Sequence, residues 1–268
     1  MFGFGTKKNN SKTKVLAVAN QKGGVGKTTT TVNLAASLSK KKKKVLLIDL
    51  DPQGNATSGS GIKKSMTAGS IYEVLIGQNT LKNIIVTSKE SFFDVATANQ
   101  SLAGAEIELV DIPDREYILK KQIESLNKQY DFILIDCPPA LNLLTVNALV
   151  AANSVLIPMQ CEYFALEGLS DLVNTIKKVK NHLNTEIEIE GLLRTLFDKR
   201  NTLAQQVSEQ LSAHFGSKVY ETIIPRNVRL AEAPSYGKPV LFYDKSSKGA
   251  IAYLALADEI LGKYNNEK

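Results

Sequence analysis

Residues that build disulfide frameworks and histidine-based sites are scarce in this sequence. Its 268 residues include two cysteines and two histidines. Cys137 and Cys161 lack the Cys-x-x-Cys spacing, which argues against a disulfide framework. We interpret both as reduced thiols in the core of a cytosolic protein. His182 and His214 are isolated in the sequence, and we interpret both as structural.

Long hydrophobic runs are also missing. No apolar stretch approaches the ~18 residues that a transmembrane helix needs, and residues 1–12 lack the apolar core of a signal peptide. We therefore predict a cytoplasmic protein with a short, flexible, basic tail over residues 1–13. Residues 14–268 are predicted to form a single domain, because α/β folds of this length commonly do. A hydrophobic content of 43% is enough for a large core.

Positive charge exceeds negative charge in this chain. The formal net charge is +6 and the sequence pI is about 9.1, which alone indicates little more than solubility. The densest run of charge is the lysine stretch from Lys40 to Lys44. Cations are favourable at the C-terminal end of a helix, so we favour a solvated helix end over a direct contact with nucleic acid.

Short apolar runs alternate with helix-like stretches along the chain. Continuous apolar runs of this kind are typical of strands buried on both faces of a parallel sheet. The alternation predicts an α/β fold, with a mostly parallel, twisted sheet and helices on both faces. Helical periodicity is clearest over 119–128 and 169–183, whereas 54–70 is rich in small polar residues and is predicted to be mobile. The predicted strands are Val15–Ala19, Val45–Ile48, Phe93–Ala96, Phe132–Ile135, Ser154–Pro158 and Glu190–Leu196.

The most informative stretch is Gln-Lys-Gly-Gly-Val-Gly-Lys-Thr at residues 21–28. It follows the first predicted strand and runs into a helix-like stretch. A strand, a glycine loop, Lys-Thr and a helix form a phosphate-binding P-loop, in which backbone N–H groups and the helix dipole meet the anion. Lys27 would bind the β- and γ-phosphates, and the Thr28 hydroxyl would hold Mg²⁺. The ordinary pattern has glycine where this chain has Gln21, and a second lysine, Lys22, follows.

Three aspartates, Asp49, Asp51 and Asp136, come just after predicted strands. The carboxyl ends of parallel strands are where such sheets bind ligands, so these carboxylates should lie near the P-loop. Asp136 is predicted to bind Mg²⁺ through water, or to respond to the γ-phosphate. Asp49 and Asp51 lie two residues apart, so on an extended chain they share a face. We predict that Asp49 lies in the Mg²⁺ shell.

The loop at residues 22–28 resembles the deviant Walker A motif of the ParA/MinD ATPases. The stretch 45–55 resembles the second motif of chromosome-partitioning ParA proteins of the Soj type, and 133–139 resembles their Walker B and switch II. Residues 158–168 and 224–229 match as well, so the resemblance covers roughly residues 14–264. It implies the P-loop NTPase fold of that superfamily.

The resemblance implies hydrolysis of ATP to ADP with Mg²⁺, in a dimer that sandwiches two nucleotides. Lys22 would cross to the nucleotide of the other subunit, much as an arginine finger does. Asp51, directly before Pro-Gln-Gly, would be the switch I residue that orients the attacking water. Together with Lys27 these are the catalytic residues that we expect. The expected ATP-binding residues are Lys22, Gly23, Gly24, Val25, Gly26, Lys27, Thr28, Thr29, Pro225 and Asn227.

The resemblance also implies partners. Pro225 and Asn227 match positions that contact adenine, where an asparagine amide can pair with the base. Arg200 and Arg229 match positions implicated in non-specific DNA binding, for which the guanidinium is well suited. A Soj-type protein would bind double-stranded DNA as an ATP-dependent homodimer, associate with the nucleoid, and be released when a ParB-type partner stimulates hydrolysis.

Three other classes of protein share this loop. A membrane-cycling ATPase of the MinD type needs a basic amphipathic C-terminal helix, but residues 251–263 carry two acids and one lysine and are typical of a helix packed on the core. We therefore predict no membrane partner. An iron–sulfur ATPase needs cysteine ligands at its subunit interface, and Cys161 has no evident partner. Amide-forming biosynthetic ligases are disfavoured by the partitioning-type motif at 51–55.

Overall fold

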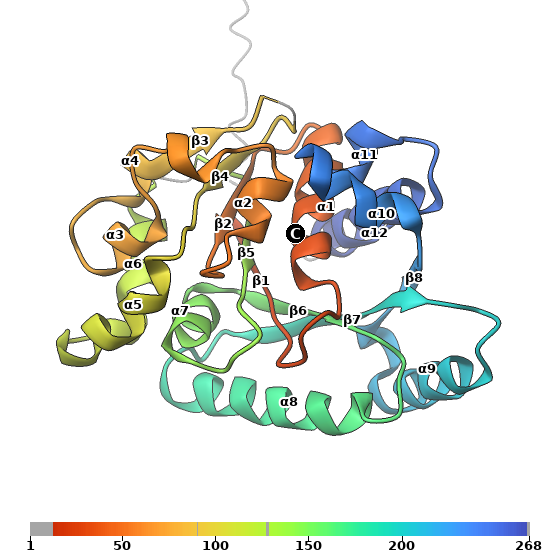
Figure 1. The fold of residues 1–268 in the computed structure, drawn as a ribbon. Coiled ribbons are helices and arrows are strands. Elements are labelled where there is room, and N and C mark those ends of the chain that lie inside the picture. The colour runs from red at the N-terminus through yellow and green to blue at the C-terminus, as the bar shows by residue number, and fades with distance from the viewer. Residues whose placement is uncertain (1–12, 90, 127–128, 267–268) are drawn as a thin grey trace, which may run out of the picture.

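The computed structural model describes residues 13–89, 91–126 and 129–266. The predicted basic tail therefore lies, apart from Thr13, outside the described residues. The strands within them are β1 (Lys14–Val18), β2 (Val45–Asp49), β3 (Ile85–Thr87), β4 (Asp94–Ala96), β5 (Phe132–Asp136), β6 (Ser154–Met159), β7 (Glu188–Phe197) and β8 (Val219–Pro225). They form one sheet in the order β3-β4-β2-β5-β1-β6-β7-β8 (Figure 1). Neighbouring strands are parallel except β3 and β4, so the predicted mostly parallel α/β fold is confirmed.

The central strands bury side chains on both faces of the sheet. In β1, Val15 and Ala17 join one hydrophobic core, whereas Leu16 and Val18 join the other. This alternation follows from the period of two in an extended chain. It explains why these strands are continuous apolar runs in the sequence, since neither face meets water.

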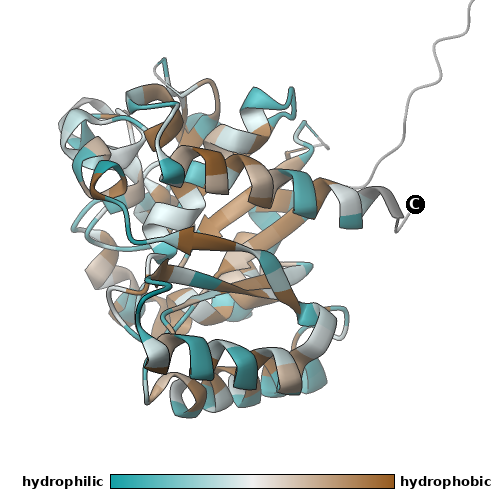
Figure 2. Cartoon of the chain, turned by 90° about the vertical axis from the view of Figure 1, so that its right-hand side faces the viewer, coloured by the Kyte–Doolittle hydropathy of each residue, from teal (hydrophilic) through white to brown (hydrophobic). Residues whose placement is uncertain are grey.

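Helices cover both faces (Figure 2). One core is closed by α1 (Lys27–Lys40), α2 (Asn55–Gly59), α10 (Val228–Glu232), α11 (Val240–Tyr243) and α12 (Lys248–Asn266). The other core is closed by α3 (Ile71–Leu75), α4 (Leu81–Ile84), α5 (Leu102–Glu108), α6 (Ile118–Glu124), α7 (Leu143–Ala151), α8 (Ala165–His182) and α9 (Thr202–Phe215). The C-terminal helix packs on the core as predicted. Among the described residues, no helix has the length and apolar character needed to cross a membrane.

Some elements differ from the sequence predictions. Strands β3 and β8 were not predicted, because both lie at edges of the sheet, where one side is left unpaired and polar residues such as Glu221 are tolerated. The stretch 54–70, predicted to be mobile, begins with α2, and its Ala56 and Thr57 are buried. Both cysteines are buried free thiols, as predicted.

Candidate nucleotide-binding site

The P-loop joins β1 to α1 at the carboxyl edge of the sheet. Gly24 and Gly26 have φ angles of 75° and 85°, a left-handed conformation that favours glycine. Val25 lies between them and is buried, and its carbonyl accepts a hydrogen bond of 2.7 Å from the Thr195 hydroxyl on β7. The middle of the loop is therefore tied to the sheet, which holds its backbone in one conformation.

Lys27 and Thr28 begin α1 beside buried carboxylates. Lys27 is 7% exposed, and its ammonium donates a hydrogen bond of 3.1 Å to the Lys22 carbonyl. Burial lowers the pKa of Lys27, and the charge of Asp136 opposes that shift. The Thr28 hydroxyl donates to the Asp136 carboxylate at 2.7 Å. An ammonium and a hydroxyl thus lie at the N-terminus of a helix, where an anion is stabilised.

Asp49 and Asp136 lie opposite each other on β2 and β5. Both side chains are fully buried. Burial raises the pKa of each carboxyl group, and the charge of Asp49 raises the pKa of Asp136 further. A divalent cation bound near them would offset this repulsion.

The donors present fit Mg²⁺, which usually takes one or two carboxylates together with waters and substrate phosphates. Thr28 and Asp136 supply a hydroxyl and a carboxylate in direct contact. No cluster of three or more His, Cys, Asp or Glu side chains able to hold a metal ion is found in the described part of the chain. The cation would therefore depend on nucleotide oxygens for its remaining ligands.

Asp49 holds the segment that carries Asp51. Its Oδ2 accepts hydrogen bonds of 2.7 Å from both the backbone N–H and the hydroxyl of Thr57, and its Oδ1 accepts one of 3.2 Å from the Asp51 N–H. Asp51 lines the neighbouring cavity, whereas Asp49 does not. One Asp51 oxygen accepts from the Gln53 N–H at 2.9 Å. The two aspartates therefore differ in position. Asp51 lines the cavity, whereas Asp49 lies outside its lining and binds Thr57 of α2.

Lys22 points away from its own phosphate loop. Lys22, Gly23 and Gly24 are exposed, and the Lys22 ammonium pairs with Glu162, which precedes α8, at 2.5 Å. A Cβ atom added at Gly23 would meet no heavy atom within 4 Å. This side of the loop is thus open to a second molecule.

A cavity of about 640 Å³ extends from the P-loop to the loop after β8. Asn227 lines it, but Pro225 lines a neighbouring cavity. The Asn227 side-chain oxygen caps α10 by accepting from the Leu230 N–H at 3.3 Å, which leaves its amide N–H groups for a ligand. Leu196, also in the lining, has a φ of 50°, a conformation that is costly for a bulky residue and is common at functional sites.

Comparisons with known proteins place this chain in a family. The family model described as an AAA domain matches residues 13–189. The chain is 54% identical over 247 residues to the sporulation initiation inhibitor protein Soj of Bacillus subtilis, covering 92% of this chain and 98% of that protein. It is 50% identical over 248 residues to the chromosome partitioning protein ParA of Myxococcus xanthus, covering 92% and 88%. The chain belongs to the ParA/Soj family of partitioning ATPases.

Solved structures resemble this ParA/Soj-type chain over nearly its whole length. Cobyrinic acid a,c-diamide synthase from Mycobacterium smegmatis, with bound ATP analog and magnesium, has a TM-score of 0.84 and 37% identity, covering 96% of this chain and 98% of that chain. A plasmid partition protein from Borrelia burgdorferi B31, bound to AMPPNP, has a TM-score of 0.77 and 27% identity, covering 96% and 100%.

Each arginine expected to bind DNA in this ParA/Soj-type chain has an acidic neighbour. The Arg200 side chain is 90% exposed and pairs with Asp198 at 2.7 Å. Arg229 on α10 pairs with Glu232 at 2.8 Å and Asp244 at 3.4 Å. Arg200 lines a cavity of about 960 Å³ together with the cationic residues Lys199, Arg226 and Lys248, whereas Arg229 does not.

Three contact residues of the site were not predicted from the sequence. They are Thr195, which holds the P-loop, Thr57, which binds Asp49, and Glu162, which pairs with Lys22. Thr195 and Glu162 lie far along the chain from the P-loop, and Thr57 lies in the stretch 54–70, which was predicted to be mobile. Only Glu162 carried a signal, since it lies inside a motif that matched the family.

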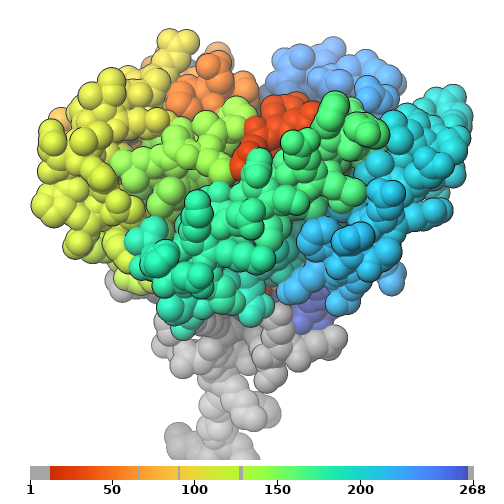
Figure 3. Space-filling model, turned by 90° about the horizontal axis from the view of Figure 1, so that it is seen from below, coloured from red at the N-terminus to blue at the C-terminus, as the bar shows by residue number. Residues whose placement is uncertain are grey.

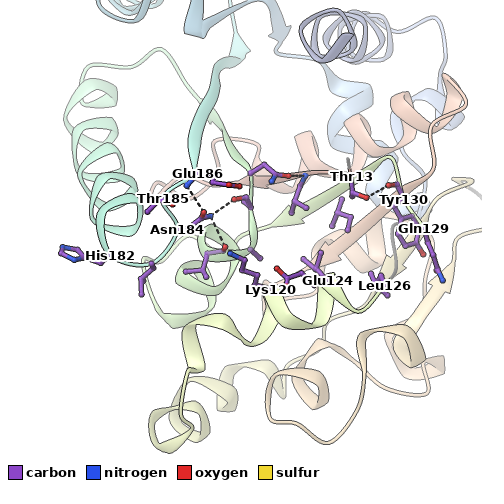
Figure 4. Close-up of a pocket in the computed structure, with 18 of the residues that line it drawn as sticks. Thr13, Lys120, Glu124, Leu126, Gln129, Tyr130, His182, Asn184, Thr185 and Glu186 are labelled. Carbon is purple, nitrogen blue, oxygen red and sulfur yellow. Dashed lines mark hydrogen bonds between the residues drawn. The ribbon is translucent and has the colours of Figure 1, made fainter. Parts of the chain in front are cut away.

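A second cavity, of about 550 Å³, lies at the opposite end of the sheet (Figure 4). It is lined by the start of β1, by α6 and by the segment after α8. Two of its asparagine side chains already have partners within the protein: the Asn184 amide donates to the carbonyls of Leu149, Val150 and Ala152, and Asn153 accepts from the Val15 N–H. The P-loop cavity is therefore the better candidate for the functional site.

Proposed function

We propose that this protein is an ATPase of chromosome or plasmid partitioning, and that residues 14–268 act as one domain. In the proposal, its ATP-bound homodimer binds DNA of the nucleoid without sequence preference. A ParB-type partner then stimulates hydrolysis and releases it. The observation that carries the proposal is the P-loop itself: Thr28 contacts Asp136 at 2.7 Å inside the protein, while Lys22 of the same loop is exposed outside it. Such a loop can bind a nucleotide on one side and a second subunit on the other.

The P-loop and the three aspartates near it have separate roles in the proposed mechanism. The backbone from Gly23 to Thr29 and the Lys27 ammonium bind the phosphates. Thr28 would hold Mg²⁺ directly and Asp136 would hold it through water, while Asp49, whose oxygens accept bonds from Thr57 and Asp51, would lie in the outer shell. When bound, Mg²⁺ neutralises charge on the phosphates. Asp51 orients the attacking water.

Lys22 and Asn227 complete the nucleotide site in this proposal. Lys22 leaves Glu162 and reaches the phosphates bound by the other subunit, where it stabilises the charge of the transferring group. Hydrolysis then requires the dimer. The amide of Asn227 pairs with adenine, with Pro225 nearby at the end of β8.

DNA binding by the dimer would use Arg200 and Arg229 of both subunits. One arginine contributes a weak contact with a DNA phosphate. A dimer presents twice as many arginines on one surface, and linking these contacts raises the overall affinity for DNA. The cations beside Arg200 in its cavity support a phosphate-binding surface.

An amide-forming synthase is less well supported, although one such enzyme shares the fold. A synthase that used a cysteine of this chain as its nucleophile would need a reactive thiol. Cys137 and Cys161 are both buried, and burial raises the pKa of Cys161 to about 11. The higher identity to Soj and ParA also favours partitioning.

A DNA-binding assay in three nucleotide states tests the proposal. Fluorescence anisotropy of a labelled random duplex is measured with ATP, with ADP and without nucleotide. The Asp51→Ala variant is included to hold the ATP state. We expect binding with ATP alone and the tightest binding with the variant. Equal affinity in the three states would contradict the proposed cycle.

A further inference from the structure

An exposed aromatic pair lies at the start of α8. Tyr163 and Phe164 are 75% and 69% exposed, and their ring centroids are 5.0 Å apart in an edge-to-face arrangement. Large apolar side chains gathered on a surface mark interaction sites, and buried aromatic residues are the commonest anchors of protein interfaces. Figure 3 shows the beginning of α8, in green, beside the red P-loop segment on one face of the molecule.

Acidic residues flank this pair along the chain. Glu162 precedes it, while Glu167 and Asp171 lie one helical turn apart on α8, and all three are exposed. Within the described residues, neither Glu167 nor Asp171 has an ion-pair partner. The local charge is therefore negative, on a chain whose net charge is +6. We call Glu162, Tyr163, Phe164, Glu167 and Asp171 the α8 patch.

The α8 patch touches the P-loop directly. Glu162 pairs with the Lys22 ammonium at 2.5 Å, and the Gln160 amide donates to the Gly24 carbonyl at 3.4 Å. In the proposed mechanism Lys22 must leave Glu162 before it can reach the other subunit. Any cation that binds Glu162 competes with Lys22 for the same carboxylate.

We propose that the α8 patch docks a cationic segment of the partner protein, one that carries apolar anchor residues. The anchors cover Tyr163 and Phe164, and basic residues bind Glu167 and Asp171. A basic residue also replaces Lys22 as the ion partner of Glu162. This exchange frees Lys22 for the phosphates of the other subunit and so couples docking to hydrolysis. The inference rests on the proposed function, because it gives the stimulating partner a binding site.

The aromatic anchors are tested with Tyr163→Ser/Phe164→Ser and the purified ParB-type protein of the same genome. The matched control is Phe92→Ser, since Phe92 is 70% exposed and lies before β4, away from α8 in the chain. The concentration of partner that gives half-maximal stimulation of ATPase activity should rise by about tenfold or more in the double variant. It should not change in the control. The partner-free rate and the ATP-dependent dimer of the double variant should also match the wild type.

The exchange of ion partners is tested with Glu162→Gln, and with Glu209→Gln on α9 as the control for loss of an exposed acid. An exposed ion pair shifts an equilibrium by roughly two- to fivefold. The partner-free rate should rise by about that factor in Glu162→Gln, and the extra stimulation by the partner should fall. No such change is expected in Glu209→Gln.

The remaining outcomes overturn the inference in different ways. Full stimulation of the double aromatic variant means that the partner docks elsewhere. Loss of its ATP-dependent dimer, measured by light scattering in the Asp51→Ala background, means that a second copy of the chain covers the pair. A wild-type protein whose hydrolysis does not respond to the partner overturns the proposed function and this inference together.

Discussion

Lys27 is the residue on which nucleotide binding should depend most, because its buried ammonium lies at the start of α1, whereas Arg226, another cation in the cavity lining, lies in the loop after β8. Lys27→Ala should lower ATP affinity by about 10- to 150-fold, the loss expected for one hydrogen bond to a charged group. Isothermal titration calorimetry measures this directly. Lys22→Ala is the control, since Lys22 points away from its own site and should retain ATP affinity. Wild-type affinity in Lys27→Ala would refute the P-loop assignment.

Asp51 is the carboxylate that faces the cavity, and its proposed action is on water rather than on the bound nucleotide. Asp51→Ala should therefore bind ATP and form the dimer, but hydrolyse ATP at least about 100-fold more slowly. Size-exclusion chromatography with ATP would show a persistent dimer. The control is Asp198→Asn, which removes a half-exposed carboxylate that does not line the nucleotide cavity. A wild-type rate in Asp51→Ala would remove Asp51 from the mechanism.

At the scale of elements, α2 is held to the sheet by one buried side chain. The Thr57 hydroxyl donates to Asp49 at 2.7 Å and accepts from the Ala98 N–H at 3.0 Å, so it joins the ends of β2 and β4. Thr57→Val keeps the shape of the side chain but removes both bonds. The free energy of unfolding should fall by about 1–3 kcal/mol, because buried polar groups lose their partner. Urea denaturation measures the change.

Thr57→Ser is the matched control for that prediction. It retains the hydroxyl, so both hydrogen bonds can form, and its loss of stability should be smaller than that of Thr57→Val. Any loss of stability in Thr57→Ser measures the packing of the methyl group, which Thr57→Val keeps. A Thr57→Val variant as stable as the wild type would show that the bonds to Asp49 and Ala98 add no net stability.

At the scale of the whole molecule, the exposed side of the P-loop, at Lys22, Gly23 and Gly24, should determine whether two subunits can dimerise. Gly23 has no heavy atom near the position of a Cβ, so Gly23→Val should fold and bind ATP. The branched side chain would stand between two subunits that meet at their P-loops, and the ATP dimer should be lost. Sedimentation in the Asp51→Ala background checks this. Gly262→Val, on the exposed side of α12, is the control and should still dimerise.

The DNA surface should also be a property of the dimer. Arg229→Ala removes one phosphate contact per subunit, so the slope of log affinity against log salt should fall by about 2 per dimer. The measurement is a salt titration of DNA binding by ATP-trapped protein. Lys177→Ala on α8 removes an exposed cation from another face and should leave the slope unchanged. An unchanged slope in Arg229→Ala would exclude Arg229 from the surface.

The sequence alone determined the elements whose signal is local. Buried central strands are continuous apolar runs, and the P-loop lies within eight consecutive residues, 21–28, so both could be predicted from neighbours in the chain. The edge strands β3 and β8 could not, because exposure on one side lets polar residues interrupt the pattern.

Contacts between distant segments were decided by the tertiary structure. Thr195 reaches the Val25 carbonyl and Glu162 reaches Lys22 only because β6 lies next to β1 and β7 lies next to β6 in the sheet order. Asp49 and Asp51 are two residues apart and were predicted to share a face near the phosphates, but only Asp51 lines the cavity, whereas Asp49 binds Thr57 of α2. Residue type and spacing fix what a side chain can bind, whereas the partner it meets depends on which strands and helices pack side by side.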